Sequence, residues 1–439
     1  MEQDKPQARI LGRRNFVMGI GAASLAAGTA GAVLSGTGQA SRTDGVAEKA
    51  ASAPAMTDLP RIAWEGGPEY WRRFGKAAAA GWTDPAFFPV GVFFGRPAHA
   101  KHLKSLGINV FQAVEHNDPL SVATAEGMFC IPQDEFTAAE IGEDPLAVGL
   151  LAYDECDMGL GCGGATTQES LANMRAQVDR LRSRNDGRFI NANYSKGVLE
   201  TFWARGTMGD FMSVVDAASV DNYAYTSPHT GVAVVASAHW PLGVPVARSA
   251  TYGWLVDRMR AFQASPGVQP NWMLVETAMP YLTEAGASTI LPDQIEGACW
   301  SAIIHEARGI VFFQHNNDGI NGNYSLVESP LPRQELIRTA ISRIRAMAPV
   351  LNTQSYEWDF GADSDTMLKA HDGAAYVFAS LALGTEPGSR TFTLPASFAA
   401  TAVEVVGEQR SIPISNSTFT DVFPFEYTHH IYRIPVALG

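Results

Sequence analysis

The chain has 439 residues, which is long enough for two domains or for one barrel with an appendage. Its composition of 46% hydrophobic, 10% aromatic and 18% charged residues excludes a disordered, collagen-like or coiled-coil protein. The 32 basic and 45 acidic residues give a net charge of -13, so the surface should repel phosphate backbones and nucleic acid is not expected as a partner. The four cysteines are too few to staple a chain of this length and form no paired CxxC metal signature.

Residues 1–40 resemble a twin-arginine signal peptide. A polar start is followed by the segment GRRNFVM at 12–18, then by a weakly apolar run, and then by a small-residue cleavage site at 38–40. The apolar run is diluted by many Gly, Ala, Ser and Thr residues, which is not typical of a transmembrane anchor. We therefore expect export to the periplasm, the cell envelope or the medium, with no stable membrane association after the signal is removed.

Residues 41–57 are small and polar and predict a flexible leader. From 58 to 350, short apolar runs alternate with helical stretches, the pattern of a parallel α/β sheet. Eight strands are predicted, at 88–94, 109–114, 128–131, 149–153, 189–193, 218–223, 271–275 and 309–313. Helices are predicted at 98–106, 168–184, 254–264, 292–307 and 332–347. Eight strand–helix units over about 290 residues predict a (β/α)8 TIM barrel at 58–350.

After residue 350 the pattern changes to short apolar runs separated by Asp-Gly, Pro-Gly and Asn-Ser turns. The runs lie at 356–360, 367–370, 375–382, 391–394, 402–406, 411–414 and 430–434. This pattern predicts a small antiparallel β-sandwich at 351–439.

Polar and aromatic residues follow the predicted barrel strands, at the end where chemistry collects in such a barrel. Amides and carboxylates bind hydroxyl groups, and aromatic faces stack on sugar rings, so this lining suits a neutral polyhydroxylated ligand such as a poly- or oligosaccharide. The predicted substrate-binding residues are Arg96, Glu115, His116, Asp154, Asn193, Tyr194, Asn222, Tyr223, Tyr225, Gln314 and His315. For His116 and His315 an ordinary structural role remains an equal alternative.

Two carboxylates stand out. Glu155 follows LLAYD at the end of the fourth predicted strand, and Glu276 follows WMLV at the end of the seventh. Strands four and seven face each other across a barrel mouth, which can bring two side chains to the separation of roughly 5 to 5.5 Å that a retaining glycosidase needs.

At this point the chain resembles the clan A glycoside hydrolases, which are (β/α)8 enzymes, over most of residues 60–350. In that family the acid/base follows strand four and the nucleophile follows strand seven. The resemblance implies a secreted retaining O-glycosidase without a cofactor, with Glu155 as general acid/base and Glu276 as nucleophile. The segments VEVVGEQR, FTDVF and HIYRI of the tail look like the small β-sandwich that closes many glycosidase barrels.

The chain departs from this family at one position. Most members have Asn before the acid/base, where its amide binds the sugar 2-hydroxyl, whereas this chain has Asp154. An aspartate can accept a hydrogen bond from the same hydroxyl, but its charge beside Glu155 would raise the pKa of one of the two carboxyls. The sequence leaves open which of them carries the proton.

Two other functions remain as alternatives. One is a catalytically inactive barrel that binds glycan. The other is an NAD(P)-dependent oxidoreductase, because residues 159–164 satisfy GxGxxG between a predicted strand and helix. Three acidic residues lie where the pyrophosphate would sit, namely Asp154, Glu155 and Asp157, and they disfavour that reading.

The cysteines and histidines indicate disulfide chemistry instead of a metal site. We expect Cys156 and Cys162 to form a local disulfide after export, and Cys130 and Cys299 to stay reduced and buried in apolar segments. The chain has no HxH after the first predicted strand and no HExxH, so no metal ligands are predicted.

Overall fold

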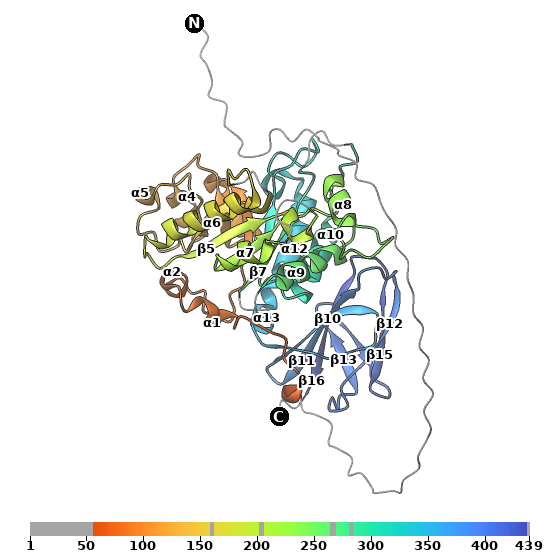
Figure 1. The fold of residues 1–439 in the computed structure, drawn as a ribbon. Helices are drawn as coiled ribbons and strands as arrows, with labels where there is room; N and C mark the ends of the chain where they lie inside the picture. The colour runs from red at the N-terminus through yellow and green to blue at the C-terminus, as the bar shows by residue number, and fades with distance from the viewer. Residues whose placement is uncertain (1–55, 159–161, 202–205, 264–268, 281–284, 437–439) are drawn as a thin grey trace, which may run out of the picture. The chain divides into compact units, whose positions relative to one another are not determined.

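The computed structural model describes residues 56–158, 162–201, 206–263, 269–280 and 285–436 (Figure 1). The predicted signal peptide, residues 41–55 of the predicted leader and residues 159–161 of the GxGxxG motif lie outside the described residues.

Eight parallel strands form one sheet in the order β3-β2-β1-β8-β7-β6-β5-β4. The sheet closes between β3 and β4 through backbone hydrogen bonds from Cys130 N to Leu146 O (2.8 Å) and from Val148 N to Cys130 O (3.0 Å). The predicted (β/α)8 barrel is therefore confirmed. Its strands are β1 Val90–Gly95, β2 Val110–Val114, β3 Phe129–Ile131, β4 Gly149–Asp154, β5 Phe189–Tyr194, β6 Ala217–Val220, β7 Asn271–Glu276 and β8 Gly309–Phe313.

Helices fill the connections between the strands and cover the outside of the sheet. The long helix α12 buries Ile337, Ile341 and Ile344, which recur at helical spacing along one face. The helices are α1 Pro68–Trp71, α2 Gly75–Ala79, α3 Ala100–Leu106, α4 Leu120–Thr124, α5 Ala138–Ile141, α6 Thr167–Arg182, α7 Met208–Ser213, α8 Pro228–Val235, α9 Ala250–Ala261, α10 Pro292–Ile304, α11 Ser325–Glu328, α12 Leu331–Ala346 and α13 Ala348–Leu351. Short 3-10 turns are η1 Met56–Asp58, η2 Pro97–His99, η3 Cys156–Met158 and η4 Lys196–Leu199.

Alternate residues along each strand face opposite sides of the barrel wall. In β7, Trp272 and Leu274 belong to the cluster inside the barrel, whereas Met273 and Val275 belong to the cluster between the sheet and the helices. Trp71 and Trp82 pack against each other, with ring centroids 4.7 Å apart, and against Trp272 and Phe189, near the start of their strands, at 4.9 to 6.3 Å. Large aromatic rings thus close the N-terminal end of the barrel and leave the C-terminal end for polar groups.

The C-terminal residues form antiparallel sheets, as predicted. One sheet has six strands in the order β14-β13-β16-β11-β10-β9, and β12 pairs with β15. Phe392 of β12 stacks on Phe419 of β15, and both contact Tyr432 of β16, so a separate apolar core joins the two sheets. The strands are β9 Ser355–Tyr356, β10 Ser364–His371, β11 Ala374–Leu381, β12 Gly388–Thr393, β13 Ala402–Val405, β14 Arg410–Pro413, β15 Thr418–Phe423 and β16 His429–Pro435.

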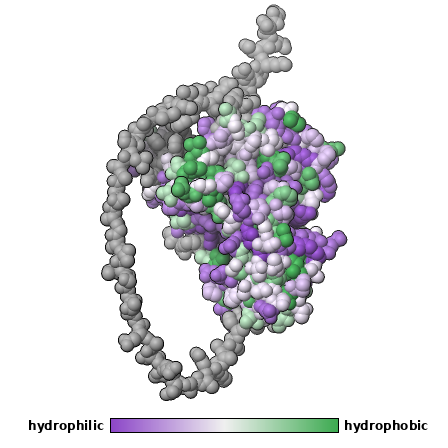
Figure 2. Space-filling view, turned by 90° about the vertical axis from the view of Figure 1, so that its right-hand side faces the viewer, coloured by the Kyte–Doolittle hydropathy of each residue, from purple (hydrophilic) through white to green (hydrophobic). Residues whose placement is uncertain are grey.

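On the face in Figure 2, small green groups of hydrophobic residues are scattered among purple hydrophilic ones. None of the helices in the described ranges is long and apolar enough to span a bilayer.

A buried histidine joins the barrel to the C-terminal β-domain. His305, just after α10, lies 2.8 Å from a carboxylate oxygen of Asp257 in α9 and 3.1 Å from one of Asp365 in β10. Burial alone would lower the pKa of His305, but the two carboxylates outweigh it and hold the pKa well above its ordinary value. The imidazolium form therefore stabilises the folded state.

We expect His305→Gln to lower the free energy of unfolding by about 2 kcal/mol at about pH 6, because two charge-assisted contacts are lost. A histidine with a raised pKa gives its full stabilisation below its unfolded pKa and loses it as the pH rises through the folded pKa. The deficit of the variant should therefore shrink at alkaline pH in urea unfolding curves. Asp257→Asn is the matched control with a smaller loss, since the Asp257 side chain is 54% exposed. A deficit that does not change with pH would contradict the assignment.

Candidate active site

A fully buried carboxylate at the C-terminal end of the barrel is Glu276, the last residue of β7. Trp272 and Leu274 face the barrel interior, so the two-residue period of the strand turns Glu276 inward as well. Backbone pairing sets it opposite Phe313 of β8. The residue is 0% exposed.

Glu276 is held by two neutral hydroxyl groups. Tyr252 donates to Oε2 at 2.7 Å and Thr226 donates to Oε1 at 3.2 Å. Within the described part of the chain, no Lys, Arg or His side chain pairs with this carboxylate. Burial raises the pKa of Glu276 to about 7, and the bonds from Tyr252 and Thr226 oppose that rise.

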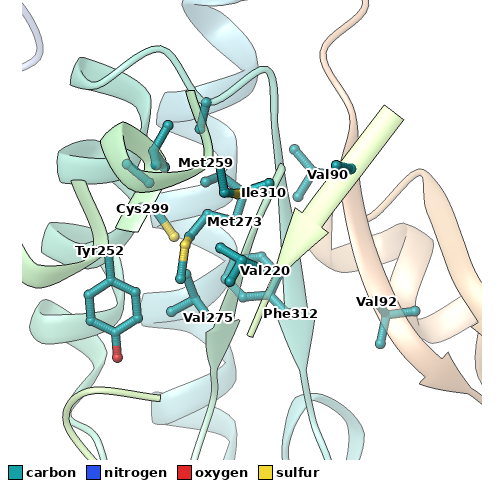
Figure 3. Packing of buried hydrophobic residues seen from close by; sticks show 14 of the residues in the cluster. Val90, Val92, Val220, Tyr252, Met259, Met273, Val275, Cys299, Ile310 and Phe312 are labelled. Carbon is teal, nitrogen blue, oxygen red and sulfur yellow. The ribbon is translucent and has the colours of Figure 1, made fainter. Parts of the chain in front are cut away.

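Tyr252 is fixed by the packing of α9 on the sheet. Figure 3 shows its ring beside Val275 in the same cluster as Met259, Met273 and Cys299, with the hydroxyl oxygen pointing away from the sulfur atoms. The side chain is 0% exposed. The apolar cluster therefore fixes the Tyr252 ring, and the Tyr252 hydroxyl donates to the Glu276 carboxylate.

A chain of buried polar side chains crosses the barrel interior from β2 to β4. Gln112 Nε2 donates to Asn191 Oδ1 and to Ser219 Oγ, at 2.6 Å each. Ser219 donates to Asn193 Oδ1 at 2.8 Å, and Asn193 Nδ2 donates to Asp154 Oδ1 at 2.8 Å. Gln112, Asn191, Asn193 and Ser219 are all 0% exposed. The chain fixes the amide of Asn193 so that it presents Asp154 to the mouth.

The end of β4 is irregular, and this irregularity places both candidate acids. Leu151 pairs with Asn191 but Asp154 pairs with Asn193, so one extra residue bulges from β4. Glu155 follows in the left-handed region with φ 55° and donates its backbone N–H to Asn193 O at 2.9 Å. A left-handed non-glycine residue costs about 1 to 3 kcal/mol and is concentrated at functional sites. Glu155 is half-buried, and no donor among the described residues contacts its carboxylate.

Asp157 anchors the loop after β4, two residues beyond Glu155. Asp157 is buried and accepts hydrogen bonds from the backbone N–H groups of Ser195 (3.0 Å) and Gly197 (2.7 Å). Burial, aided by the nearby charge of Glu155, raises the pKa of Asp157 to about 7 despite these bonds. The predicted disulfide between Cys156 and Cys162 is present, and Cys130 and Cys299 are free and buried, as expected.

A polar cluster forms on the opposite rim, where β1, β2 and β8 end. Glu115 accepts from Arg96 Nε at 3.1 Å and from the Tyr324 hydroxyl at 2.7 Å. The Arg96 guanidinium lies over the Tyr324 ring, 4.6 Å from its centroid. His315 lies 3.8 Å from Glu115, and its Nε2 lies 2.8 Å from Phe94 O. The structure thus brings together the predicted residues Arg96, Glu115 and His315.

Two predicted binding residues make contacts with other parts of the fold. His116 pairs with Glu140 at 2.8 Å, and its ring packs on Phe136 at 4.4 Å. Tyr194 is 0% exposed, and its hydroxyl donates to Phe211 O at 2.6 Å in the layer between sheet and helices. Both have structural partners, so we leave them out of the proposed site.

The other predicted residues follow β6 and β8. Asn222 is buried and donates to Ser195 O at 3.0 Å, and Tyr223 stacks on Phe313 with centroids 5.3 Å apart. The Tyr225 hydroxyl donates to Glu426 Oε1 at 2.7 Å. Gln314 is 0% exposed, and neither its amide nitrogen nor its amide oxygen has a hydrogen-bond partner among the described residues.

The sequence patterns did not identify four residues that contact the candidate acids or the rim. They are Thr226, Tyr252, Tyr324 and Gln112. Tyr252 lies in a helix and Tyr324 after a loop, where no strand-end rule points to them. The sequence could have pointed to Gln112, because an amide inside a buried apolar strand needs a hydrogen-bond partner across the barrel.

Among the described residues, no three His, Cys, Asp or Glu side chains gather as a metal site would require.

No family model matches the chain, and no curated protein matches it. It resembles a solved glycoside hydrolase at 9% identity and TM-score 0.48, over 80% of this chain and 93% of the other. A family 39 glycoside hydrolase from Bacteroides cellulosilyticus gives 10% identity and TM-score 0.47, over 80% and 82%. A family 5 glycoside hydrolase from Bacteroides vulgatus gives 9% identity and TM-score 0.47, over 80% and 90%. Similarity at this level leaves the reaction to be judged from the chain's own side chains.

The buried charge of Glu276 should destabilise the fold at neutral pH. Its folded pKa is raised above the ordinary 4.5 to about 7, so ionisation begins to cost free energy above about pH 4.5 and the full cost is reached above about pH 7. Glu276→Gln should therefore match the wild type near about pH 4 and exceed it by up to about 3 kcal/mol near about pH 8, as measured by urea unfolding. Parallel stability curves for the two proteins would show that Glu276 titrates normally.

Proposed function

We propose that the protein is a retaining glycoside hydrolase that cleaves O-glycosidic bonds of a poly- or oligosaccharide. The observation that carries this proposal is Glu276, a fully buried carboxylate at the C-terminal end of a barrel strand that accepts from two hydroxyl groups and pairs with no Lys, Arg or His among the described residues. A buried carboxylate kept for stability alone would be paired with a cation. One held by Tyr252 and Thr226 is oriented but not neutralised, which is what a nucleophile needs.

The acid/base is Glu155 in this proposal. Asp154 accepts a hydrogen bond from the Asn193 amide, which orients its carboxylate and suits it to accept from a sugar hydroxyl. Glu155 has no donor among the described residues, and it lies close enough to Asp157 for the two charges to interact. A carboxyl that no internal donor engages is available to contact the leaving oxygen and transfer a proton.

The reaction would proceed in two displacements. A carboxylate oxygen of Glu276 forms a bond to the anomeric carbon while the bond to the leaving oxygen breaks and Glu155 gives that oxygen its proton. Glu155, now ionised, takes a proton from water, and the water oxygen displaces Glu276 from the anomeric carbon. The configuration at that carbon is retained, and both carboxyls return to their starting states.

The rim supplies groups that suit sugar hydroxyls. Asp154, Asn193, Asn222, Tyr223, Tyr225 and Gln314, with the rim residues Arg96, Glu115 and His315, form the proposed binding surface. Gln314 supports this assignment most directly, since a fully buried amide with both atoms unbonded within the described residues has capacity for a ligand or water.

Export through the twin-arginine pathway is the proposed route to the substrate. The Cys156–Cys162 disulfide is compatible with an oxidising compartment outside the cytoplasm. A glycan-binding barrel without activity is the competing function, and the two variants below separate it from an enzyme.

Glu276→Gln should fold and lose at least about a thousandfold in kcat on any glycoside that the wild type hydrolyses, because no other carboxylate replaces the nucleophile. Turnover of aryl glycosides and cell-wall polysaccharides measures this. Glu140→Gln, on the outside of the barrel, is the matched control and should keep its activity. A Glu276→Gln variant that retains near-wild-type turnover would remove Glu276 from the site.

Glu155→Ala should slow substrates with poor leaving groups far more than activated aryl glycosides, since only the former need a proton on the departing oxygen. Azide should restore turnover and give a glycosyl azide of retained configuration, because the anion attacks without a general base. If Asp154→Ala behaves this way and Glu155→Ala does not, the two roles are exchanged. A product of inverted configuration would exclude the two-step mechanism.

A further inference from the structure

The loop between β15 and β16 of the C-terminal domain is seated on barrel helices α9 and α10. Ser249, the residue before α9, donates its backbone N–H to Glu426 Oε2 and its hydroxyl to Glu426 O, both at 2.9 Å. Gly297 of α10 makes room for the loop, because a Cβ there would lie 2.6 Å from Tyr427 Cβ and from Tyr427 O. The loop is thus fixed by the barrel on two sides.

Glu426 reaches from this loop to the residues around Glu276. Its Oε1 accepts from the Tyr225 hydroxyl at 2.7 Å. The Tyr225 ring stacks on Tyr252, with centroids 5.8 Å apart and 25° between the planes. The backbone N–H of Tyr225 donates to the Tyr252 hydroxyl oxygen at 3.4 Å.

Tyr252 completes the path by donating to Glu276 Oε2 at 2.7 Å. Because the Tyr225 N–H lies against the Tyr252 oxygen, the phenolic hydrogen is directed to the carboxylate. The same N–H also lowers the pKa of Glu276. The contacts that link Glu426 to Glu276 therefore fix two donors, the hydroxyl hydrogen of Tyr252 and the backbone amide of Tyr225.

We infer that Glu426 is a positioning residue through which the C-terminal domain orients Tyr225 and Tyr252 and thereby sets the geometry of Glu276. The consequence for turnover rests on the proposed function. The β-domain is then part of the active site's support and not only a cover for the barrel.

Other titratable groups lie along this path, and the test must account for them. Near Glu276 these are Tyr225, Tyr252 and the buried thiol of Cys299. Beside Glu426 they are Arg248 and Tyr427. The variants below leave Cys299, Arg248 and Tyr427 unchanged.

The experiment compares Glu426→Gln and Tyr225→Phe in the full-length exported protein. Glutamine has one acceptor oxygen in place of two, so either Tyr225 or Ser249 loses its acceptor. Glu426→Gln should lower kcat about tenfold with less than about a twofold change in KM, and Tyr225→Phe should lower kcat by about the same factor. The acid limb of the kcat profile should move to higher pH, because Tyr252 donates less well to ionised Glu276. The double variant should show no further change.

Ser249→Ala is the matched control. It removes the hydroxyl, which donates to Glu426 O and also interacts with the Glu426 carboxylate and Tyr225. It keeps the Tyr225–Glu426 bond and the bond from Ser249 N to Glu426 Oε2, so it should lower the melting temperature without moving the pH profile. If Glu426→Gln behaves like this control, or if its effect adds fully to that of Tyr225→Phe, Glu426 is only an interface anchor and the inference is wrong.

An infrared titration tests the inference independently of the proposed function. The carboxyl band of Glu276 is identified as the one absent from Glu276→Gln, and its midpoint needs no substrate. An upward shift of that midpoint in both Glu426→Gln and Tyr225→Phe supports the positioning role even if no glycoside is hydrolysed. An unchanged midpoint overturns the role, even if Glu276→Gln proves that the protein is a glycosidase.

Discussion

The structure depends on the burial of one carboxylate without a counter-charge. Glu276 lies at the end of β7 inside a wall of apolar strands, and the side chains that bond it in the described chain donate through hydroxyl groups. Removing such a charge from water costs several kcal/mol, which a stable fold tolerates only where the rest of the structure compensates. The apolar layers on both faces of β7 supply that compensation, and they also prevent Glu276 from turning toward solvent.

Irregular backbone at the barrel mouth also positions polar side chains. Phe94 and Ala113, near the ends of β1 and β2, have φ of 48° and 58°, and Glu155 after β4 has 55°. Each is a left-handed non-glycine residue where a regular strand would continue. Because such turns re-aim the side chains that follow, the strands deliver Arg96 and Glu115 to the mouth, and the bulge in β4 places Asp154. The hydrogen-bonded side chains from Gln112 to Asn193 support this part of the barrel from inside.

The sequence predicted the fold well because the barrel strands are apolar and short and their ends carry polar residues. All eight barrel strands lie within a few residues of the predicted runs. The pattern of short apolar runs did not include β15, although the family resemblance pointed to its segment FTDVF, because Asp421 occupies a core-facing position between Phe419 and Phe423. Two bonds from Arg410 and one from Tyr432 satisfy that aspartate, and such partners cannot be read from a local pattern.

The candidate site was only partly predictable for the same reason. Strand ends identified Glu276, Asp154 and Glu155, because parallel strands bring their ends together. They also selected Tyr194, whose outward direction follows from its place next to the inward Asn193. Contacts from helices and from the distant β-domain, such as those of Tyr252 and Glu426, arise from tertiary packing and leave no periodic signal in the sequence.

The central claim is that Glu276 attacks the anomeric carbon. It is tested most directly by incubating the protein with a panel of activated 2-deoxy-2-fluoro glycosides, which form a glycosyl-enzyme that hydrolyses slowly. Mass spectrometry of the digested protein should then find one sugar on the peptide that contains Glu276 and none in the Glu276→Gln variant. A sugar attached to the peptide that contains Asp154 and Glu155, or turnover of the parent glycosides by the Glu276→Gln variant at the wild-type rate, would contradict the account.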